Sequence, residues 1–309
     1  ILLDANNVEK SNPNHCYQKP LGYQLVHQYA IENLDIVEYD NISYQKYLKT
    51  VISTDYMNNQ PMKPTVTENS YDSNLHYQLT KEIQTYSDNK INETYFSYAH
   101  EKNNTKLINA NIVGVPLEIT VSAKQNAGDY GKIISKKETK YDNPAHLLPT
   151  SVLSYDLKDN TSGSTEVAYD QYDSNGNLQQ YTGKDKISTV IIWGYNNTQP
   201  IAKIEDIKLT AIQQSYITAI VNASNTDAAA GTNNDESSLL SAFTTFRGQL
   251  PNHQITTYSY DPLIGVRSIT PPSGIREVYL YDPAGRLKEI RENHQTGRLV
   301  KEFKYNYKN

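Results

Sequence analysis

The frame Y-D-x-x-G-[NR]-L occurs twice, as Tyr172-Asp173-Ser174-Asn175-Gly176-Asn177-Leu178 and as Tyr281-Asp282-Pro283-Ala284-Gly285-Arg286-Leu287. Aspartate opens a turn by accepting hydrogen bonds from the backbone that follows it, and glycine adopts the positive φ that such a turn needs. Tyrosine favours strands and can end one, and leucine can begin the next. The frame therefore predicts a tight turn between two antiparallel strands at both places.

The Tyr-Asp pair recurs along the chain, which indicates a repeat architecture. Tyr260 and Tyr281 are 21 residues apart, and Tyr281 and Tyr305 are 24 residues apart, a period typical of repeat proteins. Residues 287–291 alternate apolar and polar side chains, as a half-buried strand does. We therefore expect a succession of β-hairpins. The pairs are Tyr39-Asp40, Tyr71-Asp72, Tyr141-Asp142, Tyr155-Asp156, Tyr169-Asp170, Tyr172-Asp173, Tyr260-Asp261 and Tyr281-Asp282.

Further strands are expected on both sides of these turns. The most apolar stretch, residues 189–193, has the length of a buried strand. A second turn at residues 294–299 leads to a closing strand at residues 300–307. Upstream candidates are residues 95–98, 111–120 and 132–135, and residues 1–70 are expected to form strands without a clear repeat frame.

One region has a helical pattern. Thr210 and Gln213 fit a capping box, and a stripe at helical spacing follows them. Asp235 can cap a second helix that ends before Pro251. We expect an inserted αα-hairpin that packs on the sheet and covers an edge; docking of a partner protein is the alternative. The two stripes are Ile212, Tyr216, Ala219, Ile220 and Ala223, and Leu239, Leu240, Phe243, Phe246 and Leu250.

The composition excludes several classes of protein. The 309 residues include 26 tyrosines but only 4 phenylalanines and 1 tryptophan, with a mean hydropathy of −0.67. Tyrosine suits half-buried surfaces because its ring packs while its hydroxyl reaches a polar partner, so we expect thin, extensive sheets. The net charge of −5 without a basic block argues against nucleic acid as a partner. No apolar run approaches the roughly 18 residues of a membrane helix.

Residues with catalytic or metal-binding chemistry are scattered. The single cysteine, Cys16, follows His15, so on a strand the two side chains would point to opposite faces. No HExxH, GxSxG or phosphate-binding glycine-rich loop occurs. We therefore predict no catalytic, cofactor-binding or metal-binding residues and no cofactor. The histidines are His15, His27, His76, His100, His146, His253 and His294.

Two specific kinds of site fit the sequence poorly. An EF-hand with Gly176 as its central glycine would use Asp173 and Asn175 but would begin with Gln171 and end with Thr182, where a bidentate glutamate is required. The aspartate is better explained by turn geometry. A glycosidase needs two carboxylates that converge across a cleft, and no feature of the sequence selects such a pair.

The sequence resembles the RHS/YD-repeat family. The residues that carry the resemblance are Ile191-Ile192-Trp193-Gly194-Tyr195-Asn196-Asn197-Thr198-Gln199-Pro200-Ile201-Ala202, Tyr260-Asp261-Pro262-Leu263-Ile264-Gly265-Val266, Ile269-Thr270-Pro271-Pro272-Ser273-Gly274-Ile275 and the repeat at Tyr281. They look like the terminal repeat block of long Bacteroidota surface proteins, and Leu147-Leu148-Pro149-Thr150-Ser151-Val152-Leu153-Ser154-Tyr155-Asp156 fits the same branch. The resemblance is strongest over residues 188–307 and includes the chain from about residue 75 onward.

The resemblance implies a long sheet of antiparallel hairpins that spirals into a hollow shell, and export by type IX secretion. Toxin-carrying relatives end the shell with an Asp-Pro-x-Gly motif at which an aspartate drives self-cleavage. This sequence departs from that pattern. The spacing from Asp261 to Gly265 is one residue too long, and Asp282-Pro283-Ala284-Gly285 is followed by an ordinary repeat turn. Self-cleavage by these residues is therefore not expected.

Taken together, we predict a mainly β fold of antiparallel hairpin repeats that form a curved sheet or shell, with one helical hairpin inserted. The predicted divisions are residues 1–74, 75–205, 206–250 and 251–309, and both ends are expected to be cuts through a longer polypeptide. The predicted function is that of a non-catalytic structural or interaction segment of a secreted cell-surface protein. Its expected partners are the rest of its own polypeptide, secretion-machinery or cell-surface proteins, and glycans. The alternatives are a shell around a C-terminal toxin, a carbohydrate-binding adhesin, a hydrolase and a cargo of a secretion machine.

Overall fold

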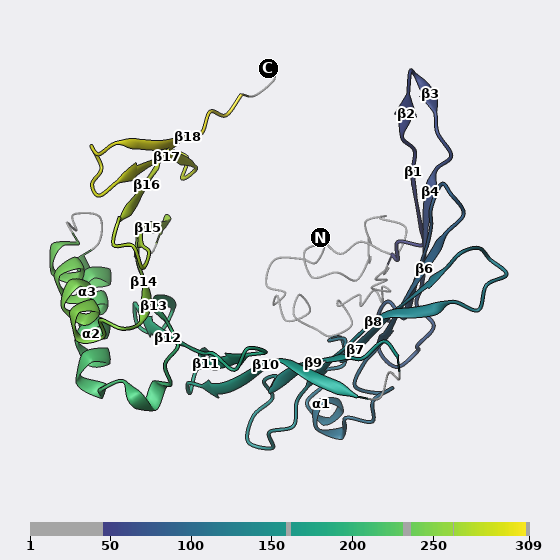
Figure 1. Cartoon of the computed structure of the whole chain (residues 1–309), viewed down its shortest axis with the longest axis horizontal. Coiled ribbons are helices and arrows are strands. Elements are labelled where there is room, and N and C mark those ends of the chain that lie inside the picture. The colour runs from purple at the N-terminus through teal and green to yellow at the C-terminus, as the bar shows by residue number, and fades with distance from the viewer. Residues whose placement is uncertain (1–45, 159–161, 231–235, 262, 307–309) are drawn as a thin grey trace, which may run out of the picture. The chain divides into compact units, whose positions relative to one another are not determined.

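The computed structural model describes residues 46–158, 162–230, 236–261 and 263–306, and the chain divides into two compact units, residues 1–48 and 49–309. All described strands and helices lie in the second unit (Figure 1). Sixteen strands form one antiparallel sheet. They are β1 (Thr50–Ser53), β4 (Thr65–Ser70), β5 (Lys81–Thr85), β6 (Ile91–Ser97), β7 (Glu118–Lys124), β8 (Lys132–Lys140), β9 (Ser151–Tyr155), β10 (Gly163–Tyr172), β11 (Leu178–Gly183), β12 (Ser188–Gly194), β13 (Gln199–Glu205), β14 (Gln254–Asp261), β15 (Gly265–Thr270), β16 (Glu277–Tyr281), β17 (Leu287–Glu292) and β18 (Leu299–Glu302).

The strands of this sheet lie side by side in chain order. Each strand pairs with the one before it and the one after it, and among the described residues β1 and β18 are the two edges. Two short strands, β2 (Tyr56–Met57) and β3 (Gln60–Pro61), form the tip of the hairpin that joins β1 to β4. The predicted fold class, mainly β with antiparallel hairpins in a curved sheet and an inserted helical hairpin, is confirmed.

The Tyr-Asp-x-x-Gly frames are turns between paired strands, as expected. In the first frame Asp173 Oδ1 accepts hydrogen bonds from the N–H groups of Asn175 and Asn177, at 2.9 and 2.8 Å. The second frame repeats this geometry at Asp282, with distances of 2.9 and 3.0 Å. Gly176 has φ of +85° and Gly285 has φ of +73°, a region that glycine enters without steric cost.

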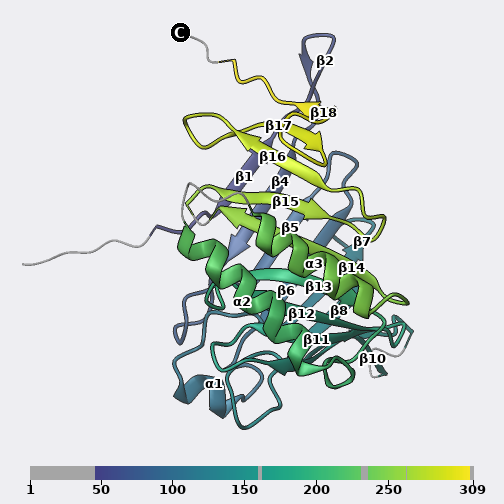
Figure 2. The ribbon, with the colours of Figure 1, turned by 90° about the vertical axis from the view of Figure 1, so that its left-hand side faces the viewer.

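Two helices interrupt the succession of strands. They are α2 (Gln214–Ala230) and α3 (Ser237–Gln249), and a 3-10 helix at Leu209–Ala211 precedes them. β13 and β14 nevertheless pair directly, with Ile204 opposite Ile255. The helices pack on the face of the sheet at β12 and β14 (Figure 2). The expectation that they cover an edge is therefore wrong, because the strands on either side of the insertion are interior strands.

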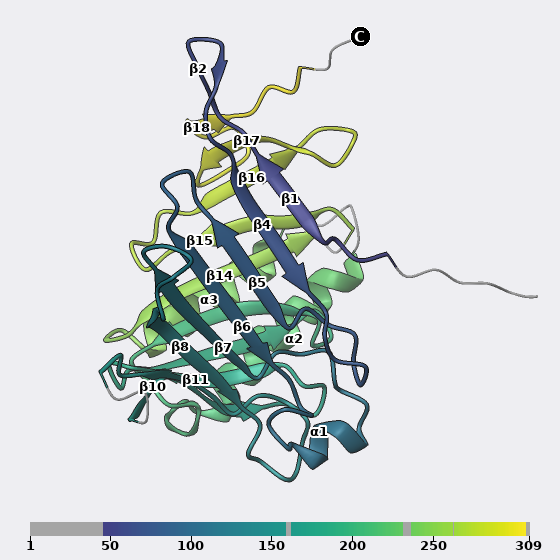
Figure 3. The same cartoon turned by 90° about the vertical axis from the view of Figure 1, so that its right-hand side faces the viewer.

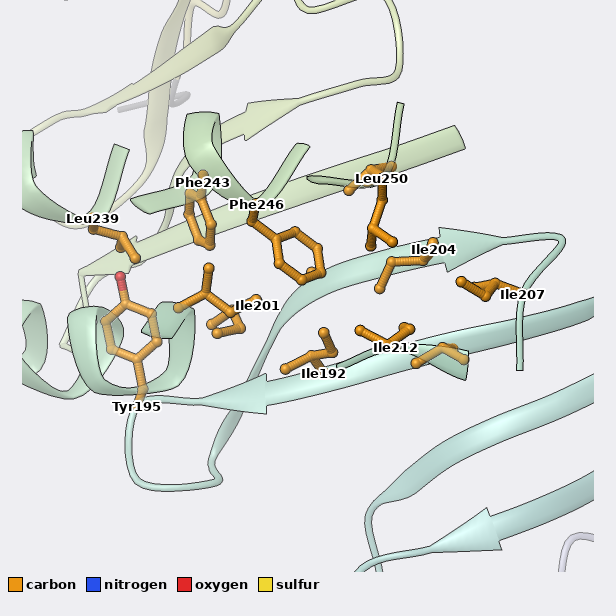
Figure 4. Close-up of a cluster of buried hydrophobic side chains, with 14 of the residues drawn as sticks. Ile192, Tyr195, Ile201, Ile204, Ile207, Ile212, Leu239, Phe243, Phe246 and Leu250 are labelled. Carbon is orange, nitrogen blue, oxygen red and sulfur yellow. The ribbon is translucent and has the colours of Figure 1, made fainter. Parts of the chain in front are cut away.

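The main core lies between this helical hairpin and the sheet (Figure 4). Ile201 and Ile204 on β13 are fully buried against Ile220 of α2 and against Leu239 and Phe246 of α3. Burying a side chain of this size contributes about 1.5–3 kcal/mol relative to leaving it exposed. A smaller cluster of Ala99, Leu107 and Leu117 surrounds the short helix α1 (Thr105–Asn109).

The structure corrects several predicted boundaries. Residues 111–117 are not a strand: α1 ends at Asn109 and β7 begins at Glu118. The last strand ends at Glu302, so the predicted strand at residues 300–307 is too long. Thr210 lies inside the 3-10 helix, and α2 begins after Gln213, so the predicted capping box does not form.

The helical stripes are corrected in part. On α2, Ala219 is exposed, and the polar residues Ser224 and Asp227 continue the buried stripe. The N-cap of α3 is Glu236 and not Asp235, which lies outside the described residues. The predicted divisions of the chain at residues 74, 205 and 250 stay predictions.

Candidate functional site

Tyrosine hydroxyls join the end of one strand to the start of the strand before it. Tyr172 ends β10 and donates a hydrogen bond of 2.8 Å to the carbonyl of Pro149, which precedes β9. Tyr281 ends β16 and donates at 2.8 Å to Val266 in β15. We call this contact a tyrosine tie. Five occur in the described part of the chain: Tyr98 to Leu79, Tyr172 to Pro149, Tyr260 to Pro200, Tyr281 to Val266 and Tyr305 to Leu287, at 2.6–2.8 Å.

The ties give five of the 26 tyrosines a specific structural role. The end of each strand in an antiparallel hairpin lies beside the start of the preceding strand, so a tyrosine there can pack its ring on the sheet while its hydroxyl bonds a carbonyl. Burial raises the pKa of Tyr172 and of Tyr260 to about 12. Each of these hydroxyls is the hydrogen-bond donor, because its carbonyl partner can only accept.

A buried polar group holds the helical hairpin on the sheet. We call Gly194, Tyr195, Ser224, Asp227 and Tyr260 the hairpin lock. The Tyr195 N–H donates to Ser224 Oγ of α2 at 3.1 Å. A Cβ atom on Gly194 would lie 2.2 Å from that Oγ and 2.8 Å from the Ile201 side chain. Only glycine allows α2 to approach β12 so closely.

Tyr195 is the centre of this lock. Its hydroxyl donates to Asp227 Oδ2 at 2.7 Å and accepts from the N–H of Tyr260 at 2.9 Å. The rings of Tyr195 and Tyr260 meet edge to face, with their centroids 5.5 Å apart. Burial raises the pKa of the Tyr195 phenol, and the neighbouring Asp227 carboxylate raises it further. The lock thus joins α2, the β12–β13 turn and β14.

A second buried polar group lies at the start of α3. Glu236 is 5% exposed and has φ of +59°, an uncommon conformation for a residue with a side chain. Its carboxylate lies 3.1 Å from Arg267 Nε and 3.9 Å from Arg276 Nη1, and it accepts a hydrogen bond from Ser259 Oγ. The guanidinium groups compensate the buried charge, so α3 is also fastened to β14, β15 and the segment before β16.

Two loops of the upstream sheet share one geometry that the sequence analysis missed. Both have the form Y-D-x3-H-x3-T, beginning at Tyr71 and at Tyr141. His76 Nδ1 accepts from the N–H of Gln78 at 3.0 Å, and His146 Nδ1 accepts from the N–H of Leu148 at 3.2 Å. Each ring packs on a tyrosine that makes a tie, at 4.4 and 5.4 Å between centroids. The identical spacing of the two loops could have revealed them.

The first of these loops also fixes the tautomer of its histidine. A backbone N–H can only donate, so His76 Nδ1 carries no proton, and its Nε2 donates to Glu101 Oε1 at 3.2 Å. Of the other histidines, His100 stacks on His76 at 6.5 Å, and His294 Nδ1 lies 3.0 Å from Thr296 Oγ1. His15, His27 and Cys16 lie outside the described residues.

The residues of the EF-hand considered at positions 171–182 use their oxygen atoms in hydrogen bonds within the protein. Asp173 accepts from two backbone N–H groups and from the Asn177 amide, and Thr182 Oγ1 donates to Asp170 at 2.6 Å. Across the residues that the structure describes, no group of three or more His, Cys, Asp or Glu side chains could hold a metal ion.

A buried carboxylate beside one surface depression is paired with cations. A depression of about 340 Å³ beside α1 includes Glu138, which is 6% exposed. Glu138 accepts a hydrogen bond from the Tyr155 hydroxyl and lies 3.1 Å from Lys102 Nζ and 2.9 Å from Lys140 Nζ. Burial alone would raise the pKa of Glu138, but these partners outweigh it and hold that pKa at about 2.

The two aspartates of the Asp-Pro motifs line another depression, of about 250 Å³, together with Arg267. Asp282 is ion-paired with Arg286 at 2.6 Å. Asp261 Oδ1 accepts from the N–H of Leu263 at 3.2 Å, and Pro262 lies outside the described residues. Both aspartates accept backbone hydrogen bonds within turns.

In the described part of the chain, no helix is long and apolar enough to span a bilayer.

Comparison with known proteins finds no matching family model and no matching curated protein. Solved structures that the chain resembles include the toxin TcdB2-TccC3 without its hypervariable C-terminal region, with 11% identity and a TM-score of 0.35 over 82% of this chain. The same values hold for TcdB2-TccC3-Cdc42. The Tc holotoxin pore of Photorhabdus luminescens matches with 11% identity and a TM-score of 0.31 over 79% of this chain. In each case this chain spans only 12% of the matched chain.

Proposed function

We propose that this chain is a structural and interaction segment of a large secreted cell-surface protein of the RHS/YD-repeat type, without catalytic activity. The observation that carries the proposal is the sheet of sixteen strands in chain order, whose hairpins are joined by tyrosine ties. Such a sheet grows by the addition of further hairpins and forms a wall. Asp173, Asp261 and Asp282 accept hydrogen bonds within turns and five tyrosines make ties, which supports a mechanical role.

Structure determination of the whole parent protein by electron cryo-microscopy tests this role. We expect these strands to continue into neighbouring strands of the same wall. A wall that encloses a folded C-terminal domain would support the more specific function of a shell around a toxin. A parent protein in which this segment borders a cleft with two converging carboxylates would contradict the proposal and favour a hydrolase.

Secretion is part of the proposal and is supported by the resemblance of residues 188–307 to surface proteins of the Bacteroidota. In the bacterium that encodes it, we expect protease added to intact cells to digest the parent protein. Deletion of the type IX translocon should retain the protein inside the cell. Unchanged surface exposure in the deletion strain would contradict this route of export, and protection in both strains would contradict a surface location.

A further inference from the structure

Two loops of the sheet carry a histidine at the same position but have different charges beside it. Residues 71–80 join β4 to β5, and residues 141–150 join β8 to β9. The connection from β6 to β7, which includes α1, contacts both loops at the same end of the sheet (Figure 3). Its Glu101 contacts the first loop and its Lys106 contacts the second. The first histidine therefore lies near a carboxylate, and the second lies near an ammonium group.

The second loop needs its histidine to be neutral. His146 Nδ1 accepts a hydrogen bond from the Leu148 N–H at 3.2 Å, and the ring meets the Tyr172 ring edge to face. A backbone N–H can only donate, so a proton on Nδ1 would break this bond and bring two donors together. The Tyr172 phenol cannot compensate the added charge, because burial raises its pKa to about 12 and keeps it neutral.

The charges around His146 also oppose its protonation. Lys106 Nζ donates to three carbonyls of the loop, those of Tyr141, Asn143 and His146, at 2.7, 2.7 and 3.0 Å. Among the described residues, no carboxylate forms an ion pair with His146, and Asp142, the acidic residue of the loop, is exposed. A proton on His146 would therefore place a second cation beside Lys106 without a paired anion.

The first loop has the opposite surroundings. His76 Nδ1 accepts from the Gln78 N–H at 3.0 Å, and Nε2 donates to Glu101 Oε1 at 3.2 Å. The other titratable groups that face this ring are His100, at 6.5 Å between centroids, and Tyr98, at 4.4 Å. A proton on His76 would break the bond from Gln78 but would form an ion pair with Glu101. We therefore expect acid to affect this loop less.

We propose that His146 is an acid-sensitive latch, which closes the loop at residues 141–150 when it is neutral and opens it when it gains a proton. The closed loop binds fewer protons than the open loop, so it is favoured at higher pH and is lost as the pH falls. Opening would remove the Pro149 carbonyl that accepts from Tyr172, and would uncover the turn at Gly176, whose Cβ would lie 3.7 Å from Leu148. This latch does not depend on the proposed function.

Hydrogen–deuterium exchange followed by mass spectrometry compares both loops in one sample, after correction for the intrinsic effect of pH on exchange. If histidine has a pKa of about 6.5 in the open loop, the open fraction rises about tenfold between about pH 7.5 and about pH 5.5. We expect residues 141–150 to lose protection by this factor and residues 71–80 to lose less. Equal protection of residues 141–150 at the two pH values would overturn the proposal.

His146→Asn separates the hydrogen bond from the proton. An asparagine oxygen can accept from the N–H two residues later, as Asn143 Oδ1 accepts from the Ala145 N–H at 2.9 Å, but it does not titrate. We expect the variant to keep its protection at residues 141–150 at both pH values. A tenfold loss that persists in this variant would overturn the latch.

The matched control is His294→Asn. His294 is exposed, and its Nδ1 lies 3.0 Å from Thr296 Oγ1, a hydroxyl that can accept as well as donate. This bond can form with either protonation state of the ring, so the variant should leave the tenfold loss at residues 141–150 unchanged. Loss of the response in this control would show that the response does not arise at His146.

Glu101→Gln tests the charge beside the first loop. The glutamine keeps an oxygen that can accept from the Tyr98 N–H, which now bonds Glu101 Oε2 at 2.9 Å, but it cannot form an ion pair with His76. We expect residues 71–80 to become more sensitive to acid, while residues 141–150 respond as in the wild type. An unchanged response of residues 71–80 would contradict the argument that the neighbouring charge decides how each loop responds.

Discussion

Tyr195 and Asp227 lie 32 positions apart and share a buried hydrogen bond of 2.7 Å between the phenol and a carboxylate oxygen. Asp227 is 7% exposed and Tyr195 is 3% exposed. The bond joins the turn after β12 to α2, and it connects the inserted helices to the sheet together with the Tyr195–Ser224 and Ser259–Glu236 hydrogen bonds. Removing one partner of such a bond lowers the free energy of unfolding by more than the net contribution of the bond. The reason is that the other polar group stays buried without its partner.

We expect Tyr195→Phe to lower the free energy of unfolding by about 1–3 kcal/mol, because Asp227 and the Tyr260 N–H both lose the hydroxyl. Chemical denaturation followed by circular dichroism measures this difference. The control is Tyr130→Phe, which removes the hydroxyl of a fully exposed tyrosine and should have no measurable effect. Equal stability of the two variants would contradict the importance of the lock.

Gly194→Ala should destabilise the protein by about 2 kcal/mol or more, because the new methyl group would overlap Ser224 Oγ and the Ile201 side chain and push α2 away from β12. Thermal unfolding measures the loss. Gly248 in α3 is the matched control, since a Cβ there meets no atom within 4 Å. Gly248→Ala should stabilise the protein by about 0.5–1 kcal/mol through helix propensity. A neutral Gly194→Ala would show that α2 does not need this close approach.

Gly285→Val should destabilise its hairpin by about 1 kcal/mol or more, because valine is strained at positive φ. A Cβ at this position meets no atom within 4 Å, so the effect arises from the backbone conformation alone. Gly285→Asn should cost less, since asparagine tolerates this region better. Equal melting temperatures for the valine variant and the wild type would contradict the turn assignment.

Loss of a tyrosine tie should cost about 0.5–1.5 kcal/mol, the usual net value of one hydrogen bond. Tyr172→Phe and Tyr281→Phe remove ties in hairpins that are far apart in the strand order. Because distant sites act independently, we expect the double variant to lose the sum of the two effects. Urea denaturation of the wild type, both single variants and the double variant measures this sum. If the phenylalanine variants are as stable as the wild type, the tyrosine ring stabilises the hairpin and the hydroxyl does not.

Lowering the pH should destabilise the folded protein, because it protonates Glu138. Its pKa is about 2 in the folded chain, below the ordinary 4.5, so its ionised form stabilises the fold. That contribution, at most about 3 kcal/mol, is fully present above about pH 4.5 and is lost as the pH falls toward 2. Glu138→Gln should remove this part of the pH dependence, measured by denaturation at about pH 2.5, 3.5 and 5. Glu68→Gln, which removes an exposed charge from β4, is the control. An unchanged pH dependence in Glu138→Gln would contradict the assignment.

The sequence predicted the turns because their chemistry is local. Asp173 and Gly176 lie within the same few residues, so spacing alone identifies them. It also predicted most of the apolar stripe of α3, because helical periodicity needs no knowledge of the partner. The strand predicted at residues 111–120 forms only from Glu118 onward: the β-branched residues of 111–117 suit a strand, but this segment is a loop in which Ile112 and Leu117 pack around Leu107.

By itself the sequence determined the class of the fold and its sequential hairpins, since short turns force consecutive strands to pair. The tertiary structure alone decided which carbonyl each tyrosine hydroxyl reaches, that Gly194 must have no side chain, and that Ser224, Asp227 and Glu236 are buried. These properties depend on strand register and on the approach of a helix some thirty residues away in the chain. No local pattern contains that information.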